Sequence, residues 1–331
     1  MVEAHLIELR ERLSALQALA AVDQLILADA GLEPVVEALL DRVQPSLRGD
    51  LTCIALPSAA ESGAWDLRVD LRQDGASLRR TLTGQRGIDP TEPRAGPVPA
   101  VLRSLGARTL RVRPVMLESR RVAILGVGFF DDAPVDASLD GPMDSFGQRL
   151  SLAVARHERE ERLFRKAHYD ALTGLPNRLL FRERFDEELR RVRDGAPGGA
   201  LLYLDLDDFK QVNDSLGHGA GDQMLTVVGQ RLRACVKGSD TVARIGGDEF
   251  TVMLRELPDA ATAQTVARRI LDALSAPIWL GGEGRRIGVS VGIAAFPADG
   301  LDRDGLLRHA DAAMYRAKQQ GRGRVASLAG R

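Results

Sequence analysis

The 331-residue sequence lacks the features that mark several protein classes. Its 2 cysteines, Cys53 and Cys235, are far apart and have no metal-ligating neighbours at useful spacing, so we expect core residues rather than a disulfide framework. The formal net charge of −1 argues against a nucleic-acid partner. The longest apolar candidate, Val122 to Phe130, has the length of a strand and is too short to cross a bilayer. We therefore expect a cytoplasmic protein with no membrane partner.

The composition is that of an ordinary globular protein, with 44% hydrophobic and 27% charged residues, and the length suggests two domains. Residues 1–30 are predicted to form an N-terminal helix. Its leucines recur at alternating spacings of three and four, as in a short heptad seam: Leu6, Leu9, Leu13 and Leu16. This seam either packs on its own domain or pairs with a second chain.

Residues 31–140 are predicted to form a first domain with a mixed sheet and helices on one side. The predicted elements are a helix at Glu33 to Val43, strands at Leu51 to Leu56, Trp65 to Leu71, Leu110 to Val115 and Val122 to Phe130, and a loop at Gly84 to Pro99. This order resembles GAF domains, which are sensory modules, and a PAS-like or other sensory α/β domain is the alternative. The resemblance implies a small-molecule or protein signal that the sequence does not identify.

Residues 141–167 are predicted to form a linker helix. Pro142 suits its first turn, and apolar residues continue at spacings of three and four from Met143 through Phe146 and Leu150. The helix is interpreted either as a signalling connector that also forms a dimer seam or as a rigid spacer.

Residues 168–326 are predicted to form a second domain, an α/β (α+β) layer with an antiparallel hairpin at its centre. Strands are expected at Ala200 to Asp205, Glu249 to Leu254, Ile278 to Leu280 and Gly288 to Phe296. Helices are expected at Arg178 to Arg193, Gly219 to Val236, Ala260 to Ser275 and Arg303 to Gln319.

The hairpin carries the run Arg-Ile-Gly-Gly-Asp-Glu-Phe, residues 244–250. Apolar stretches flank it, which predicts strand, tight turn and strand. Gly246 and Gly247 permit positive φ and a close approach of a bulky anion to the backbone. Asp248 and Glu249 extend into solvent, where carboxylates bind a metal that carries phosphates. Taken alone, such a turn is usually only a hairpin.

Four more segments surround this turn in sequence order. They are Asp170 to Arg178, Leu204 to Asp214, Gly217 to Asp222 and Ala310 to Gly323. Together, the five resemble the GGDEF domain of diguanylate cyclases, a palm-like nucleotidyl-cyclase fold. The resemblance covers His168 to Arg324, about half of the chain.

A metal site is predicted from two of these segments. Asp205 ends an apolar strand, and Asp248 lies close to it if the hairpin strand is the antiparallel neighbour. Two carboxylates there suit Mg²⁺, with Mn²⁺ as an alternative, bridging triphosphate oxygens. The resemblance adds the main-chain carbonyl of Leu206 as a metal ligand. It gives Glu249 a supporting role at the metal or at the 3′-hydroxyl.

The resemblance also implies which residues bind GTP. Asn213 and Asp222 match the guanine-reading pair, and a carboxylate at Asp222 accepts the N1–H and N2–H₂ donors that adenine lacks. Gly246 and Gly247 leave room for the nucleotide.

Three cations are expected at the phosphates. Lys318 and Arg322 match the pair that binds the β- and γ-phosphates, and Lys210 is expected nearby. Asn177 and Arg178 are expected to buttress the loop of the site. Asp207 and Asp208 are given no role.

One segment departs from the family pattern. Many members carry an Arg-x-x-Asp product-inhibition site before the turn, whereas this chain has Lys237 and Asp240 at those positions. Lysine lacks the planar fork that binds phosphate and guanine edges. The segment is therefore interpreted as a degenerate inhibitory site, with a simple turn residue as the alternative for Asp240.

The resemblance as a whole implies a homodimeric diguanylate cyclase that condenses two GTP into cyclic di-GMP and two pyrophosphates. The alternatives are a catalytically weak GTP-binding module and a part of a longer protein with a cyclic di-GMP phosphodiesterase domain.

Overall fold

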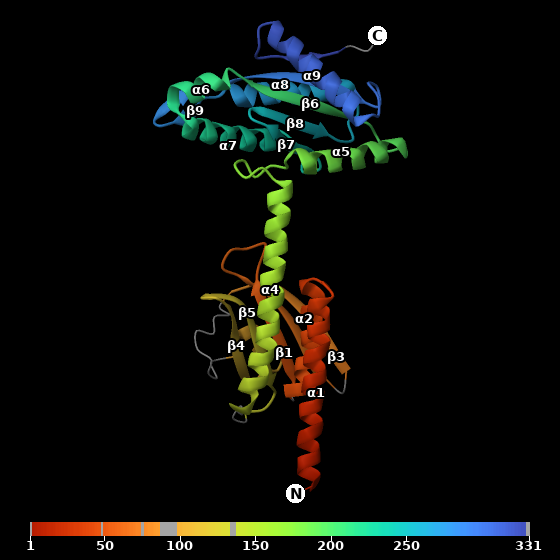
Figure 1. The fold of residues 1–331 in the computed structure, drawn as a ribbon, viewed down its shortest axis with the longest axis vertical. Helices are drawn as coiled ribbons and strands as arrows, with labels where there is room; N and C mark the ends of the chain where they lie inside the picture. Colours follow the sequence, from red (N-terminus) through yellow and green to blue (C-terminus); the bar gives the residue numbers. More distant parts are fainter. Residues whose placement is uncertain (1, 48, 74–75, 87–97, 133–136, 329–331) are drawn as a thin grey trace. The chain divides into compact units, whose positions relative to one another are not determined.

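A computed structural model describes residues 2–47, 49–73, 76–86, 98–132 and 137–328 (Figure 1). The chain divides into two compact units, Met1–Arg162 and Leu163–Arg331. Both are mixtures of helices and sheets, so the predicted α/β class is confirmed. No helix within the described ranges is long and apolar enough to cross a membrane.

The first unit is built on five strands: β1 (Leu51–Pro57), β2 (Trp65–Gln73), β3 (Ala76–Gln85), β4 (Thr109–Leu117) and β5 (Arg120–Phe129). Their order in the sheet is β3-β2-β1-β5-β4, and every pairing is antiparallel. The prediction of a mixed sheet is therefore wrong. Short hairpins join β1 to β2, β2 to β3 and β4 to β5, and such connections return the chain antiparallel to itself.

Strand β3 has no counterpart in the sequence prediction. It lies at the edge of the sheet, and Arg79 and Arg80 interrupt its alternation, so the apolar period that identifies a buried strand is weak. The loop predicted at Gly84 to Pro99 lies mostly outside the described residues.

Three helices of the first unit contribute to a core on one face of this sheet: α1 (Val2–Leu27), α2 (Leu32–Leu47) and the first half of α4 (Asp140–His168). The short helix α3 (Ala100–Arg103) joins the core on the opposite face, which also holds Cys53. Residues of β1 alternate between the two cores, with Ile54 in the first and Cys53 and Ala55 in the second. Both faces of the sheet are thus covered, rather than one.

The second unit contains helices α5 (Arg178–Arg193), α6 (Phe209–Leu216), α7 (His218–Ala234), α8 (Ala260–Ser275) and α9 (Arg303–Gln319). Its main strands are β6 (Gly199–Asp207), β7 (Thr241–Gly246), β8 (Glu249–Leu254), β11 (Gly288–Phe296) and β12 (Val325–Ser327), and β9 (Ile278–Leu280) and β10 (Glu283–Arg285) form a separate two-stranded sheet. The main order is β12-β11-β6-β8-β7.

The centre of this sheet is β6, not the hairpin. The predicted β7–β8 hairpin is present, but β7 is the edge strand and only β8 pairs with β6. Sequence patterns locate a hairpin without giving its place in the sheet, because that place depends on long-range pairing.

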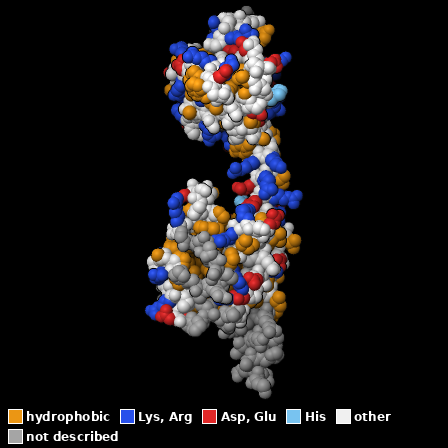
Figure 2. Space-filling model, turned by 90° about the vertical axis from the view of Figure 1, so that its left-hand side faces the viewer, with side chains coloured by type: hydrophobic (Ala, Val, Ile, Leu, Met, Phe, Trp, Pro, Cys, Tyr) orange, Lys and Arg blue, Asp and Glu red, His pale blue; other side chains and the backbone are white. Residues whose placement is uncertain are grey.

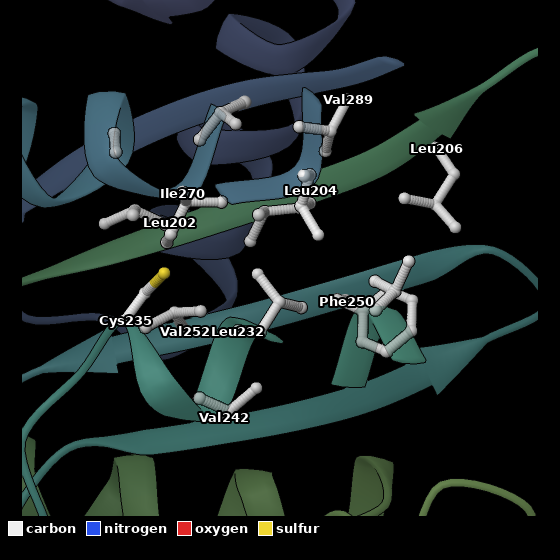
Figure 3. Close-up of a cluster of buried hydrophobic side chains, with 14 of the residues drawn as sticks. Leu202, Leu204, Leu206, Leu232, Cys235, Val242, Phe250, Val252, Ile270 and Val289 are labelled. Carbon is white, nitrogen blue, oxygen red and sulfur yellow. The ribbon is translucent and has the colours of Figure 1, made fainter. Parts of the chain in front are cut away.

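Side chains of β6 alternate between two cores. Leu202, Leu204 and Leu206 pack with residues of α7 and α8, among them Leu232 and Ile270 (Figure 3). Leu201 and Tyr203 face the other way, toward the core that α5 and α9 share. Because successive strand residues alternate, Asp205 and Asp207 emerge at the end of β6 on the α9 face. The alternation of side chains along β6 therefore places Asp205 and Asp207 on the face that packs against α9.

Candidate nucleotide-binding and catalytic site

The turn between β7 and β8 lies beside the end of β6. Asp205 pairs with Glu249 in the antiparallel register, and the Leu206 N–H donates to the carbonyl of Asp248 across 3.3 Å. Phe250 is fully buried opposite Leu204 and fixes this end of the hairpin in the core (Figure 3). The structure therefore brings Asp205 and Asp248 to one edge, as the assumption of antiparallel neighbours required.

Asp205 forms an ion pair with a lysine of α9. Its side chain is 13% exposed, and its Oδ1 lies 2.6 Å from the Nζ of Lys318 on α9. Burial raises the pKa of Asp205, and the carboxylates of Asp248 and Glu249 raise it further, against the opposing effect of Lys318. The site thus concentrates negative charge that one lysine neutralises in part.

Glu249 is held by Tyr203, whose hydroxyl donates to its Oε1 at 3.2 Å. Burial, followed by the charge of Glu249, raises the pKa of Tyr203 well above its usual range, so the phenol stays a donor. A Cβ on Gly246 would lie 2.9 Å from Oε2 of Glu249. Glycine at 246 is therefore required for the observed position of Glu249.

Arg244 connects the turn between β7 and β8 to Asp170 through hydrogen bonds and an ion pair. Its Nε and Nη2 donate to the carbonyl of Gly247 at 2.9 and 2.7 Å, and its Nη1 lies 3.1 and 3.2 Å from the two oxygens of Asp170. Asp170 also accepts the N–H and the hydroxyl of Thr173. Sequence reasoning assigned no role to either residue of this pair, because 74 residues separate them and only the fold makes them neighbours.

The expected buttress residues act at two different places. Arg178 donates from Nε to the carbonyl of Ile245, next to the turn. Asn177 is the N-cap of α5, where its Oδ1 accepts the N–H groups of Leu179 and Leu180. A groove of about 500 Å³ runs beside the turn, and Arg178, Arg182, Arg244, Gly246 and Gly247 are among its lining residues.

Asn213 and Asp222 lie on two consecutive helices. Asn213 belongs to α6 and Asp222 to the first turns of α7, with Gly217 at positive φ between the helices. A Cβ on Gly221 would meet the Oδ1 of Asn213 at 2.0 Å. The residue beside Asp222 thus touches Asn213, so the predicted pair is brought together at the junction of α6 and α7.

The predicted phosphate-binding cations come from α6, from α9 and from the turn that follows α9. Lys318 lies in the last turn of α9, Arg322 follows in the turn after it, and Lys210 is exposed in the first turn of α6. The Nε of Arg322 lies 4.0 Å from Oδ1 of Asp208. Arg322 and Asp208 also line a groove of about 600 Å³ between α6 and the 321–323 turn.

The segment from Lys237 to Asp240 is an ordinary tight turn. Asp240 accepts the Lys237 N–H at 2.9 Å through one oxygen and the Arg255 N–H at 3.0 Å through the other. Burial raises the pKa of Asp240 in spite of these hydrogen bonds. Both of its oxygens are engaged by the backbone, which favours the turn-residue alternative.

A metal here would be held by few protein ligands. Within the described parts of the chain, no group of three or more His, Cys, Asp or Glu residues could hold a metal ion. The predicted donors at the end of β6 would be two carboxylates, Asp205 and Asp248, and the carbonyl of Leu206. Oxygen donors in this number fit Mg²⁺, which is usually bound by one or two carboxylates together with substrate phosphates.

The site is thus a carboxylate and cation arrangement suited to metal-dependent nucleotide chemistry. Residues 167–324 match the family model described as "Diguanylate cyclase, GGDEF domain". The chain is 43% identical to a solved structure of a truncated TpbB from Pseudomonas aeruginosa that comprises only the GGDEF domain, covering 49% of this chain and 95% of that one, with a TM-score of 0.47. The chain therefore contains a GGDEF domain at residues 167–324.

Two further relatives extend the comparison. MucR of P. aeruginosa, a bifunctional diguanylate cyclase/cyclic di-GMP phosphodiesterase, is 40% identical over 201 residues, which are 61% of this chain and 29% of MucR. The coiled coil and GGDEF domain of DgcB from Caulobacter crescentus, crystallised with c-di-GMP, is 28% identical and covers 58% of this chain and 100% of that one, with a TM-score of 0.51. The chain spans 39% of full-length TpbB, so it covers well under half of either curated relative.

Proposed function

We propose that the protein is a diguanylate cyclase that condenses two GTP into cyclic di-GMP and two pyrophosphates. The GGDEF domain supports the class, and TpbB carries the name diguanylate cyclase. The observation that carries the proposal is the junction of Asp205 with the Gly246–Glu249 turn and with Lys318. This junction supplies carboxylates for a metal and a cation for phosphates within one site.

Asp205, Asp248 and the carbonyl of Leu206 would hold Mg²⁺, or Mn²⁺ in its place. When bound, a divalent cation neutralises phosphate charge and lowers the pKa of an attacking hydroxyl. The chain's own residues do the rest. Glu249, oriented by Tyr203, lies at the rim where the 3′-hydroxyl approaches, and Lys318, Arg322 and Lys210 bind the triphosphate.

Asn213 and Asp222 give the site its preference for guanine. A carboxylate at Asp222 accepts two donors from guanine, while adenine presents none at N1. A site built to pair with substrate N–H groups rejects an analogue without them strongly, because its own polar groups are then left unpaired.

The reaction requires two copies of the second unit facing each other, each presenting one GTP to the other's 3′-hydroxyl. Positioning supplies much of the rate in such an arrangement. Exposed leucines on α4 and α1 are candidate contacts for a homodimer: Leu152, Leu163, Leu13 and Leu16. Figure 2 shows hydrophobic side chains interspersed with charged ones along α4.

The first unit is proposed to be a GAF-like sensory domain that controls the cyclase, in the cytoplasm, where GTP is available. Apart from β3 and the short helix α3, which the sequence did not predict, its elements follow the predicted order of helices, strands and then α4. A small molecule or a protein is the expected signal.

A second candidate is a GTP-binding GGDEF module with weak turnover, in this chain or in a longer protein that also has a phosphodiesterase domain. This second candidate is supported by the match to MucR, a bifunctional protein of which the chain spans 29%. The two candidates differ in one quantity, the Mg²⁺-dependent release of pyrophosphate from GTP.

The test is cyclic di-GMP synthesis by the purified protein and by Asp248→Ala. We expect the wild type to convert GTP and the variant to lose at least a hundredfold in rate, because one of two metal-binding carboxylates is gone. The matched control is Asp272→Ala, an exposed aspartate on α8 that should retain full activity. Unchanged synthesis by Asp248→Ala would refute the assignment, and GTP binding without pyrophosphate release by the wild type would favour the second candidate.

A further inference from the structure

Asp207 is a buried carboxylate that the proposed reaction does not use. Its side chain is at the end of β6, two residues beyond Asp205 and on the same face of the strand, and the residue is 7% exposed. Its Oδ1 accepts the hydroxyl of fully buried Ser290 at 2.7 Å, and its Oδ2 accepts the Gly323 N–H at 2.9 Å. A buried carboxylate is costly unless it is hydrogen-bonded, so the Ser290 hydroxyl and the Gly323 N–H compensate for the burial of Asp207.

The Gly323 N–H belongs to a turn with an uncommon backbone. Gly321, Arg322 and Gly323 have φ values of 114°, 61° and 58°. Left-handed geometry is free for the glycines but unfavourable for Arg322, whose Cβ crowds the backbone there. Such a conformation persists only where the surroundings fix it on both sides.

Two anchors fix this turn. On its N-terminal side, the Arg322 N–H donates to the carbonyl of Ala317 in α9 at 3.1 Å. On its C-terminal side, Asp207 holds the N–H of the very next residue, Gly323, before β12 joins β11 from Val325 onward. Asp207 thus holds the turn directly after Arg322, together with the Nε of Arg324, which donates to the carbonyl of Arg322 at 3.2 Å.

Carboxylates of β6 thus contact both Lys318, in the last turn of α9, and the backbone next to Arg322. Asp205 contacts the Lys318 ammonium directly, whereas Asp207 acts on Arg322 through the backbone of the turn. The neighbouring strand leaves room for this, because residue 288 on β11 is a glycine whose Cβ would lie 2.8 Å from Oδ2 of Asp207.

We propose that Asp207 is a positioning residue, which sets the direction of the Arg322 guanidinium toward the β- and γ-phosphates of GTP. This inference rests on the proposed function. The exposed neighbour Asp208 offers a contrast, since its 4.0 Å pair with Arg322 joins side chains that are 53% and 55% exposed. Exposed pairs of this kind contribute little, so Asp208 does not fix the arginine.

The test is a double-mutant cycle on Kd for a non-hydrolysable GTP analogue and on KM for GTP. We expect Asp207→Asn to raise both about tenfold with kcat changed less than threefold, because a contact made equally to substrate and transition state appears in KM. In the Arg322→Ala background the same substitution should change Kd less than twofold. Asp208→Asn should not raise Kd.

A structural role alone would weaken binding equally in both backgrounds, and that outcome would overturn the proposal. If Asp207→Asn fails to fold, Ser290→Ala replaces it, with a smaller rise in Kd that again disappears in the Arg322→Ala background. The analogue measurement separates this inference from the proposed function. A wild type without turnover would defeat the cyclase assignment, yet the coupling between Asp207 and Arg322 would still be read from Kd.

Discussion

The Nζ of Lys318 lies 2.6 Å from Oδ1 of Asp205, so a residue expected at the phosphates neutralises a residue expected at the metal. Asp205 comes from the central strand and Lys318 from the last turn of α9, 113 positions later in the chain (318 − 205). The pair links the proposed metal ligands and the proposed phosphate ligands electrostatically. Changes to either residue are expected to affect both sets of ligands.

Replacing Lys318 by methionine should destabilise the protein in the absence of metal. Asp205 would then face Asp248 and Glu249 without a cation, and we expect a loss of about 1 kcal/mol, equivalent to about 2–4 °C in Tm. Thermal unfolding in chelator measures this. Added Mg²⁺ should recover more Tm in the variant than in the wild type, and Lys210→Met, which removes an exposed lysine of α6, serves as the control. An equal Mg²⁺-induced rise in Tm for all three proteins would contradict the proposed electrostatic link between Lys318 and the metal site.

Substituting Gly221 by alanine should impair nucleotide binding. The new Cβ would lie 2.0 Å from Oδ1 of Asn213 and force that amide out of the position in which it is proposed to contact guanine. We expect KM for GTP to rise at least tenfold, since the lost contact leaves polar groups unpaired. Gly219→Ala is the matched control on the same helix turn, because nothing lies within 4 Å of its added Cβ. The idea fails if both alanines give the same KM.

Arg244→Gln should destabilise the observed conformation of the turn between β7 and β8. It removes the charged fork that joins the carbonyl of Gly247 to Asp170, and we expect a tenfold to hundredfold loss of cyclic di-GMP synthesis with about 1–3 kcal/mol of unfolding free energy. Kinetic assays and urea unfolding measure the two effects. Arg182→Gln, an exposed residue that lines the same groove, should retain activity and stability. Full activity of Arg244→Gln would show that the turn holds its shape without the contacts of Arg244.

The contribution of Asp170 to the free energy of unfolding should depend on pH. Burial alone would raise the pKa of Asp170, but hydrogen bonds from Thr173 and Arg244 outweigh it and hold the pKa below the ordinary value of 3.8. A group whose pKa is lowered on folding stabilises the protein above its unfolded pKa, and that contribution is lost as the pH falls through the folded pKa. Urea unfolding of wild type and Asp170→Asn should therefore differ most near neutral pH and converge below about pH 4. A constant difference across this range would contradict the prediction.

Introducing glutamates at Leu152 and Leu163 should weaken a homodimer. The side chains are 57% and 56% exposed, and eleven residues are about three helical turns, so both lie on one face of α4. We expect the dimer fraction and the specific activity to fall together at low protein concentration, as measured by light scattering and product formation. Glu161→Gln, exposed on the opposite face, is the control. Loss of activity without a change in mass would argue for a different dimer contact.

The sequence by itself determined most of the second unit. The predicted bounds of α5, α8, α9, β8 and β11 coincide with those observed, because clear apolar periods, caps and turn residues mark their ends. It also predicted the candidate site, since Asp205 lies near the end of a buried strand and Asp248 occupies a glycine turn. Antiparallel pairing then makes these two residues neighbours, as the register confirms.

Only the tertiary structure decided the relations between distant segments. It put β7 at the edge of the sheet, made the first sheet antiparallel, and joined Arg244 to Asp170. It also gave Asp207 its two donors, although nothing in the local sequence distinguishes this residue from exposed Asp208. The reason is physical: periodicity and turn chemistry are local, whereas the partner of a buried polar group is chosen by which strands and helices pack together.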